Sequence, residues 1–253
     1  MKILFHKLQS QGNDFVFVNE NNVRNVELKK FAIRILDRHF GVGGDILVIY
    51  NMEHNFLRFF NPDGSEAEIC GNALLAYGEF LRILQRQSGS IEVATKGQKA
   101  KIILKEKIMV RFEIEDFKFE KITILLGKRK IQGYYTRGFG NPHFVLINPD
   151  VNFKKAREIE KHNFFSEGTN VDFITIKTRS EVTHRIWERG AGETLSCASG
   201  ALSSFMIIYA LGLVDEKVSF ISRGGILIIR KEGNSIFFTG KPEYVFKGEL
   251  NLS

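Results

Sequence analysis

His184 to Ser203 reads HRIWERGAGETLSCASGALS and holds one of the two cysteines of the chain, Cys197. Asn55 to Tyr77 reads NFLRFFNPDGSEAEICGNALLAY and holds the other, Cys70. In each stretch an arginine stands twelve positions before the cysteine and eight before a glutamate. An alternating apolar run leads into a polar loop with glycine, then the cysteine, then an apolar run of helical character. The pattern predicts a strand, a loop and a cysteine at a helix start, twice.

Other features repeat at the same distance along the chain. The two cysteines are 127 positions apart, and so are Thr95-Lys96-Gly97 and Ser222-Arg223-Gly224. Gly12-Asn13-Asp14-Phe15-Val16 is echoed by Gly140 to Val145 with one residue inserted. An offset equal to half the chain indicates internal duplication. We therefore expect two similar domains related by a pseudo-twofold axis, with Cys70 and Cys197 facing each other across the cleft between them.

The start of a helix is a chemically special place for a cysteine. Its unpaired backbone N–H groups and the positive end of the helix dipole bind carboxylates and favour a thiolate. Cysteine pKa values there fall from about 8.5 to roughly 3.5–7.5. Two such sites facing each other would hold a carboxylate between them, with a sulfur on each side of the adjacent carbon. The alternative is two buried, inert cysteines, and the matched polar surroundings of the pair argue against it.

Composition excludes several classes of protein. The formal charge is +7 over 253 residues, but Lys and Arg are spread without a dense run, which favours solvated surface over nucleic-acid binding. Phe205 to Val214 is about half the length of a membrane span, and Met1 to Lys7 is too short for a secretory signal. We expect reduced thiols and a cytoplasmic protein with no membrane or nucleic-acid partner. We expect no metal, because His6, His39, His54, His162 and His184 lack ligand spacing and should lie at the surface or core edge.

Six motifs, in order and spanning nearly the whole chain, resemble those of the diaminopimelate epimerase family. They are Gly12-Asn13-Asp14-Phe15, Phe60-Asn61-Pro62-Asp63-Gly64-Ser65, Cys70-Gly71-Asn72, Gly140-Asn141-Pro142-His143, Thr169-Asn170-Val171, and Glu188-Arg189-Gly190 through Glu193-Thr194 to Cys197.

The resemblance implies an α+β fold of two homologous, pseudo-symmetric domains, each a mostly antiparallel sheet wrapped around a central helix. Residues 1–115 would form the first domain, joined by a last strand at about 243–253 (near Tyr244 to Leu252), and residues 116–242 the second. It implies an isomerase without cofactor that converts LL-diaminopimelate to meso-diaminopimelate in lysine and peptidoglycan precursor synthesis. A small amino-acid substrate and a homodimer follow from the same resemblance.

The resemblance also assigns roles to particular residues. Cys70 and Cys197 would be the acid and base, and His143 and Glu188 would help to move protons. Backbone N–H groups at the two helix starts would hold the substrate carboxylate. The residues assigned to substrate binding are Asn13, Asn61, Gly71, Asn72, Asn141, Asn170, Glu188, Arg189, Ala198 and Ser199. Simpler roles stay open for some of them: His143 as a turn residue after Pro142, the asparagines as turn formers, and Glu193 with Thr194 as a helix cap.

The chain departs from the family pattern at several positions, and three of them bear on the substrate. Ala73 and Ala198 stand where the family has glycine, and Ile46 where Gly or Gln is usual, which puts rate and substrate size in question. Alternative functions are a racemase of lysine, histidine or proline on the same fold, or a redox or binding module whose cysteines form a disulfide. Proline offers nothing to the residues that would hold the far end of the substrate, and a disulfide of about 2 Å leaves no room for a carbon.

Overall fold

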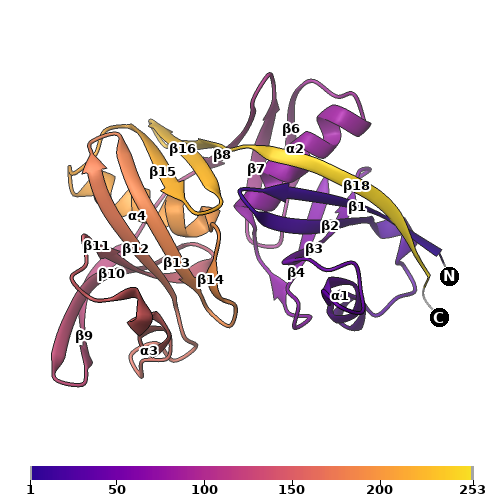
Figure 1. Cartoon of the computed structure of the whole chain (residues 1–253). Coiled ribbons are helices and arrows are strands. Elements are labelled where there is room, and N and C mark those ends of the chain that lie inside the picture. The colour runs from indigo at the N-terminus through magenta and orange to yellow at the C-terminus, as the bar shows by residue number, and fades with distance from the viewer. Residues whose placement is uncertain (1, 252–253) are drawn as a thin grey trace. The chain divides into compact units, whose positions relative to one another are not determined.

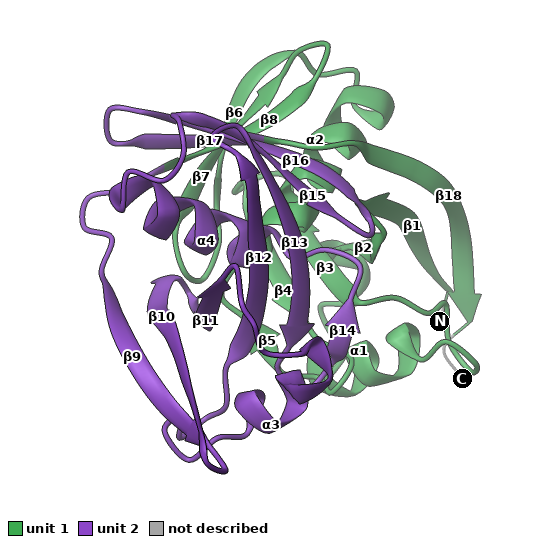
Figure 2. Cartoon of the chain, turned by 60° about the vertical axis from the view of Figure 1, so that its left-hand side comes forward, with its two compact units in different colours: residues 1–112, 239–253 green, residues 113–238 purple. Residues whose placement is uncertain are grey.

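The structure, a computed structural model, describes residues 2–251. The chain forms two compact units, one of the residues up to 112 with those from 239 onward, the other of residues 113–238 (Figure 2). That these units are the homologous epimerase halves predicted over 1–115 with about 243–253 and over 116–242 stays our proposal. The predicted last strand reached Leu252, which lies outside the described residues.

The first unit is a sheet in which consecutive strands pair in a fixed alternation. β18 pairs antiparallel with β1 and β1 with β2; β2 is parallel to β3; β3 is antiparallel to β4 and β5 folds back on β4; β4 is parallel to β6, and β6, β7 and β8 follow antiparallel. The strands are β1 (Lys2–Ser10), β2 (Asn13–Asn19), β3 (Ile46–Asn51), β4 (Phe56–Phe60), β5 (Glu66–Ala67), β6 (Gly89–Ala94), β7 (Lys99–Leu104), β8 (Ile108–Glu113) and β18 (Pro242–Asn251).

The second unit repeats this alternation. β9, β10 and β11 pair antiparallel; β11 is parallel to β12; β12 is antiparallel to β13 and β14 folds back on β13; β13 is parallel to β15, and β15 pairs with β16. The strands are β9 (Phe119–Leu126), β10 (Arg129–Phe139), β11 (Asn141–Ile147), β12 (Asn170–Thr178), β13 (Glu181–Glu188), β14 (Gly192–Thr194), β15 (Lys217–Ser222), β16 (Gly225–Glu232) and β17 (Ser235–Thr239). The two pairing schemes match strand for strand, with β18 in the place of β9.

Helices occupy equivalent places in the two schemes (Figure 1). A short outer helix lies between the first two parallel strands: α1 (Leu28–Leu36) in the first unit and α3 (Ala156–Glu160) in the second. A longer helix follows each cysteine: α2 (Gly71–Leu84) and α4 (Ala198–Ala210). Single turns of 3-10 helix, Glu20–Asn22 and Phe153–Lys155, complete the set. The predicted α+β fold with one central helix per unit is confirmed.

Strand alternation explains why each sheet is covered on both faces. In β2, Val16 and Val18 pack in one cluster with Phe31 of the outer helix α1. Phe17 points the other way and stacks on Tyr77 and Phe80 of α2. Because α2 and α4 are buried on nearly all sides, their sequences are apolar around the whole helix rather than along one stripe.

Local features mark the ends of several elements. β1 and β2 are joined by a turn at Gln11 and Gly12, both with positive φ. α1 ends at Leu36, and the Asp37 side chain that follows accepts the backbone N–H groups of His39 and Phe40. α2 ends at Leu84.

Candidate active site

Both cysteines sit at the N-cap of a central helix, as predicted. Cys70 precedes α2 with φ −138° and ψ 106°, and Cys197 precedes α4 with φ −138° and ψ 114°. The first intrahelical bonds run from Leu74 N to Cys70 O and from Ala201 N to Cys197 O. The N–H groups of 71–73 and 198–200 therefore precede the first i→i−4 hydrogen bond of their helix, and no acidic residue occupies either first turn. Each helix start is suited to an anionic group.

The equal spacing of arginine and glutamate before each cysteine has a structural counterpart. Arg58 Nε donates to Glu66 at 2.7 Å across β4 and β5, and Arg185 Nη2 donates to Glu193 at 2.9 Å across β13 and β14. Each ion pair holds the hairpin that leads into the cysteine. Thr194 donates its hydroxyl to Glu188. The alternative in which Glu193 and Thr194 cap the helix is wrong, because both side chains are engaged in the hairpin.

Around Cys197 a chain of polar side chains runs into the core of the second unit. Cys197 Sγ lies 3.3 Å from Ser199 Oγ, which lies 3.1 Å from His143 Nε2. Asn170 Nδ2 lies 3.5 Å from the same nitrogen. The structure thus gathers Cys197, Ser199, His143 and Asn170 from the predicted set. His143 is fully buried in β11 and bonded to side chains, so the alternative of a turn residue that bonds the backbone is wrong.

The sequence analysis missed two residues of this hydrogen-bonded series of side chains. Asp172 Oδ2 accepts from His143 Nδ1 at 2.7 Å, and Asp172 Oδ1 accepts from His184 Nε2 at 2.8 Å. His184 is 3% exposed, so the prediction that it lies at the surface or core edge is wrong. The available signal was alternation: Asp172 stands between Val171 and Phe173, which pack in the cluster on the α3 side of the sheet. Asp172 therefore points toward α4, where a charge needs partners.

Gly200 makes room for this arrangement. A Cβ atom built at Gly200 would lie 2.1 Å from Asp172 Oδ1 and 3.3 Å from His143 Cε1. Any larger residue would push the carboxylate away from its two histidines. The glycine in the first turn of α4 is thus a packing requirement of the buried aspartate.

The acidity of Cys197 is opposite to the prediction. Burial, with the negative charges of Glu188 and Asp172, raises the pKa of the Cys197 thiol well above its ordinary value, although the Ser199 hydroxyl and the Gly200 N–H beside the sulfur act the other way. The helix start lowers the cost of a thiolate but does not outweigh desolvation and two nearby carboxylates. Cys197 therefore carries its proton at neutral pH.

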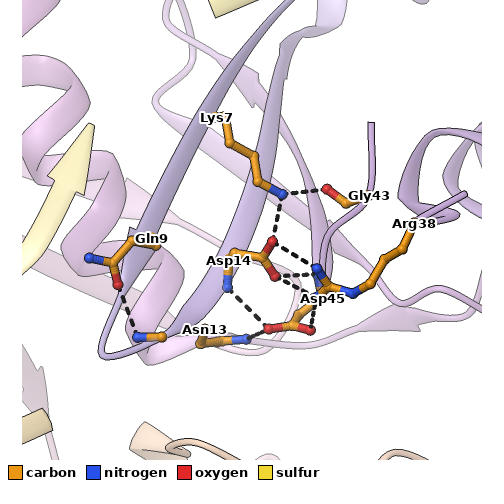
Figure 3. Close-up of polar contacts among 8 residues, drawn as sticks. Lys7, Gln9, Asn13, Asp14, Arg38, Gly43 and Asp45 are labelled. Atoms are coloured by element: carbon orange, nitrogen blue, oxygen red, sulfur yellow. Dashed lines mark hydrogen bonds and ion pairs between the residues drawn. The ribbon is translucent and has the colours of Figure 1, made fainter. Parts of the chain in front are cut away.

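The residues around Cys70 differ from those around Cys197. It is half-buried, and its sulfur lies 3.9 Å from Asn13 Oδ1. Asn13 Nδ2 donates to Asp45 at 2.8 Å, which fixes the amide with its oxygen toward the thiol. Figure 3 shows Asp45 between Asn13 and Arg38, in a network that continues through Asp14 to Lys7. Burial raises the pKa of Asp45.

Near Cys70, the Asp14 carboxylate is stabilised as an anion by two basic side chains, Arg38 and Lys7. Burial alone would raise its pKa, but the hydrogen bonds from Arg38 and Lys7 hold it at about 2. Lys7 also donates to the Gly43 carbonyl, so the ammonium ties β1 to the Gly-rich turn before β3. The turn that carries Asp45 is fixed in this way.

The remaining predicted substrate residues lie near the ends of strands or in the first turns of α2 and α4. Asn170 Oδ1 accepts the backbone N–H of Arg189 at 2.8 Å, and the Arg189 guanidinium donates to the Glu167 carbonyl at 3.0 Å. Asn61 follows β4 and donates to Ser65 Oγ at 3.0 Å. Gly71, Asn72, Ala198 and Ser199 begin α2 and α4, Asn141 begins β11 and Glu188 ends β13. Their roles toward a substrate stay predictions.

Residues 2–251 contain no cluster of three or more His, Cys, Asp or Glu side chains arranged to hold a metal ion. None of the helices described there is both long enough and apolar enough to cross a membrane.

Comparison with known proteins gives full-length relatives. Residues 5–118 and 135–245 match the family model described as diaminopimelate epimerase. A protein named diaminopimelate epimerase from Halothermothrix orenii is 33% identical over 280 residues, covering 99% of this chain and 98% of the relative. Another of that name from Carboxydothermus hydrogenoformans is 34% identical over 272 residues, covering 98% and 99%.

Solved structures show how widely the fold is shared. A hydroxyproline epimerase from Agrobacterium vitis with bound trans-4-hydroxy-L-proline superposes with a TM-score of 0.72 at 12% identity, covering 98% of this chain and 92% of that one. A probable proline racemase from Agrobacterium radiobacter gives 0.73 at 9%, covering 99% and 93%. At such identities these matches show the fold alone. With the family model and the full-length relatives together, the chain belongs to the diaminopimelate epimerase family.

Proposed function

We propose that this protein interconverts LL- and meso-diaminopimelate by direct proton transfer at the α-carbon, with Cys70 and Cys197 as base and acid. The observation that carries the proposal is the pair of cysteines, each at the N-cap of a central helix with almost the same backbone angles. Inverting a carbon that bears a weakly acidic C–H requires a base on one face and an acid on the other. Two thiols meet that requirement and exchange roles between the forward and reverse directions.

The protonation of Cys197 suits the acid in one direction of the reaction. Its pKa is raised chiefly by burial, so it enters the cycle as a thiol. A thiolate at Cys70 would then remove the α-hydrogen, and Cys197 would deliver its proton to the opposite face. Two thiolates about 7 Å apart would repel by roughly 2.4 kcal/mol at an effective dielectric of about 20. One thiol and one thiolate is therefore the favoured pair.

The carbanion formed in this step needs electrostatic support. We propose that the substrate carboxylate is held by backbone N–H groups of Gly71, Asn72, Ala198 and Ser199, which would stabilise the enediolate as charge develops. His143 and Glu188 would assist proton transfer at Cys197. Asn13, Asn61, Asn141, Asn170 and Arg189 would hold the other groups of the substrate, with Arg189 able to form a bidentate carboxylate pair.

Isotope exchange tests the proposal. The reduced protein is incubated with LL-diaminopimelate in deuterated water, and the α-proton signal and stereoisomers are followed by NMR and chiral chromatography. We expect deuterium at the α-carbon as meso product appears. No exchange with this substrate, but exchange with lysine, histidine or proline, would reassign the substrate. If none of these amino acids exchanged its α-hydrogen, a redox or binding module would be favoured. The predicted cytoplasmic location and homodimer stay predictions, testable by cell fractionation and light scattering.

A further inference from the structure

We propose that Asp172, held by His184, fixes the tautomer of His143 so that Ser199 relays the proton of Cys197 to His143 Nε2. This inference deepens the proposed function and rests on it for its kinetic arm. Asp172 and His184 are positioning residues, since they act through His143. Ser199 acquires a side-chain role besides its predicted backbone contact.

The first step is the state of Asp172. Its carboxylate is fully buried and accepts one hydrogen bond from each histidine. Burial alone would raise the pKa of Asp172, but the hydrogen bonds that its two oxygens receive from His143 and His184 oppose this effect, and its pKa lies below the usual value. The carboxylate is therefore ionised and can only accept. Both histidine nitrogens that face it, His143 Nδ1 and His184 Nε2, must carry hydrogens.

The second step is the other nitrogen of His143. Asn170 Oδ1 accepts the Arg189 N–H, which leaves the NH₂ of Asn170 as the end that faces His143 Nε2. An amide NH₂ donates and cannot accept. A lone pair on Nε2 therefore fits its neighbours, and His143 is a neutral imidazole with its hydrogen on Nδ1.

The third step is the direction of the remaining bonds. With a lone pair on His143 Nε2, Ser199 Oγ–H donates to it at 3.1 Å, and the Ser199 oxygen accepts from the Cys197 thiol at 3.3 Å. Every donated hydrogen in this series of hydrogen bonds thus points from Cys197 toward Asp172. The arrangement is set for transfer in one direction before the substrate arrives.

The proton balance follows directly. Cys197 S–H breaks as its hydrogen passes to Ser199 Oγ, while the original Ser199 hydrogen passes to His143 Nε2. The products are a thiolate, an intact hydroxyl and an imidazolium whose Nδ1–H still binds ionised Asp172. Afterwards the imidazolium donates to Ser199 and Ser199 donates to the thiolate. The reverse transfer restores the thiol, so the relay lets a cysteine whose pKa is raised act as the base in the opposite direction.

Imidazole NMR tests the tautomer without substrate. In protein labelled with ¹⁵N-histidine, two-bond ¹H–¹⁵N spectra distinguish a protonated ring nitrogen from one with a lone pair. We expect His143 protonated at Nδ1 and His184 at Nε2 near neutral pH, and we expect Asp172→Asn to disturb both patterns. His143 protonated at Nε2 in the unmodified protein would overturn the inference, whatever the folding of the variant.

Turnover tests the relay with matched variants of α4. Ser199→Ala should lower kcat about 10- to 100-fold with KM changed less than about threefold, and Ser199→Thr should restore most of the rate because it keeps the hydroxyl. Ser203→Ala, in the same helix and with no hydrogen-bond partner for its buried hydroxyl among the described residues, is the control with unchanged rate. An unchanged kcat in Ser199→Ala would overturn the relay. Absence of turnover in the unmodified protein would overturn the proposed function instead, and the tautomer spectra would still decide the role of Asp172.

Discussion

Cys70 and Cys197 begin helices with nearly the same backbone angles, yet the sheet faces packed against those helices differ in polarity. The sheets can be matched through their parallel pairs, Val16 with Leu47 and Phe144 with Val171, all four of which pack on the side of the outer helix. By this matching the inner positions held by His143, Asp172 and His184 in the second unit are held by three buried apolar residues in the first. These are Phe15, Val48 and Leu57.

The difference reaches the first turn of each central helix. Gly200 faces the Asp172 carboxylate, where a Cβ would collide. The equivalent residue in α2 is Ala73, which is fully buried and lies over the sheet that has Val48 in place of the aspartate. The two units share the strand order, the ion pair and the helix start. They differ on the inner face, where an apolar face packs well without partners whereas a buried charge requires a complete set of hydrogen bonds.

The two cysteines should remain equally necessary despite these surroundings. Cys70→Ser and Cys197→Ser should each lower kcat by about 10²–10⁴, because a serine hydroxyl is a poor acid and a poor base at neutral pH. Exchange of the α-hydrogen in deuterated water measures the rate, and circular dichroism checks the fold. Near-normal turnover in either variant would end the two-base mechanism and make the two regions functionally unequal.

Exchanging the equivalent first-turn residues tests the packing difference. Gly200→Ala should destabilise the protein by about 3 kcal/mol, since the methyl displaces Asp172 from its histidines and leaves a buried charge poorly paired. Ala73→Gly, the matched change in α2, should cost only about 1 kcal/mol of helix propensity and packing. Urea unfolding measures both. Equal losses would show that the two helix starts are packed alike.

Low pH should lower the stability of the protein through protonation of Asp14, which lies in the network beside Cys70. Its pKa is about 2 in the folded protein against about 3.9 when unfolded, so its ion pairs contribute stability that is complete above about pH 4 and lost as the pH falls toward 2. Asp14→Asn should therefore be less stable than the unmodified protein by roughly 2 kcal/mol at pH 7, with the gap closing in acid. Urea midpoints between pH 2.5 and 7 measure the gap, and a constant difference across that range would contradict the assignment.

The smallest expected effect compares two equivalent hydroxyls on the central helices. Tyr77 Oη in α2 and Ser204 Oγ in α4 are buried and have no hydrogen-bond partner among the described residues. Tyr77→Phe and Ser204→Ala should each stabilise the protein by about 1 kcal/mol. The buried hydroxyl loses its hydration on folding without gaining a hydrogen bond, and the apolar replacement avoids this cost. Thermal unfolding measures this, and destabilisation in either case would reveal a polar contact, such as a bound water, that differs between the helices.

The sequence by itself determined the architecture and the place of the two cysteines at helix starts. Repeated spacing predicts the duplication, the hairpins and the cysteines at helix starts, because strand and helix periodicities are local properties of the chain. It also indicated Asn13, His143, Asn170 and Ser199. Alternation along the strand also singles out Asp172, a carboxylate between the apolar residues Val171 and Phe173.

Only the tertiary structure decided how these residues work. The high pKa of the Cys197 thiol depends on burial and on the charges of Glu188 in β13 and Asp172 in β12, which lie near the start of α4. The partnership of His184 with Asp172 joins residues twelve positions apart across β12 and β13, and the link from His143 to Ser199 spans fifty-six. Electrostatic energies depend on distance and on the exclusion of water, and both are properties of the packed molecule rather than of any one segment.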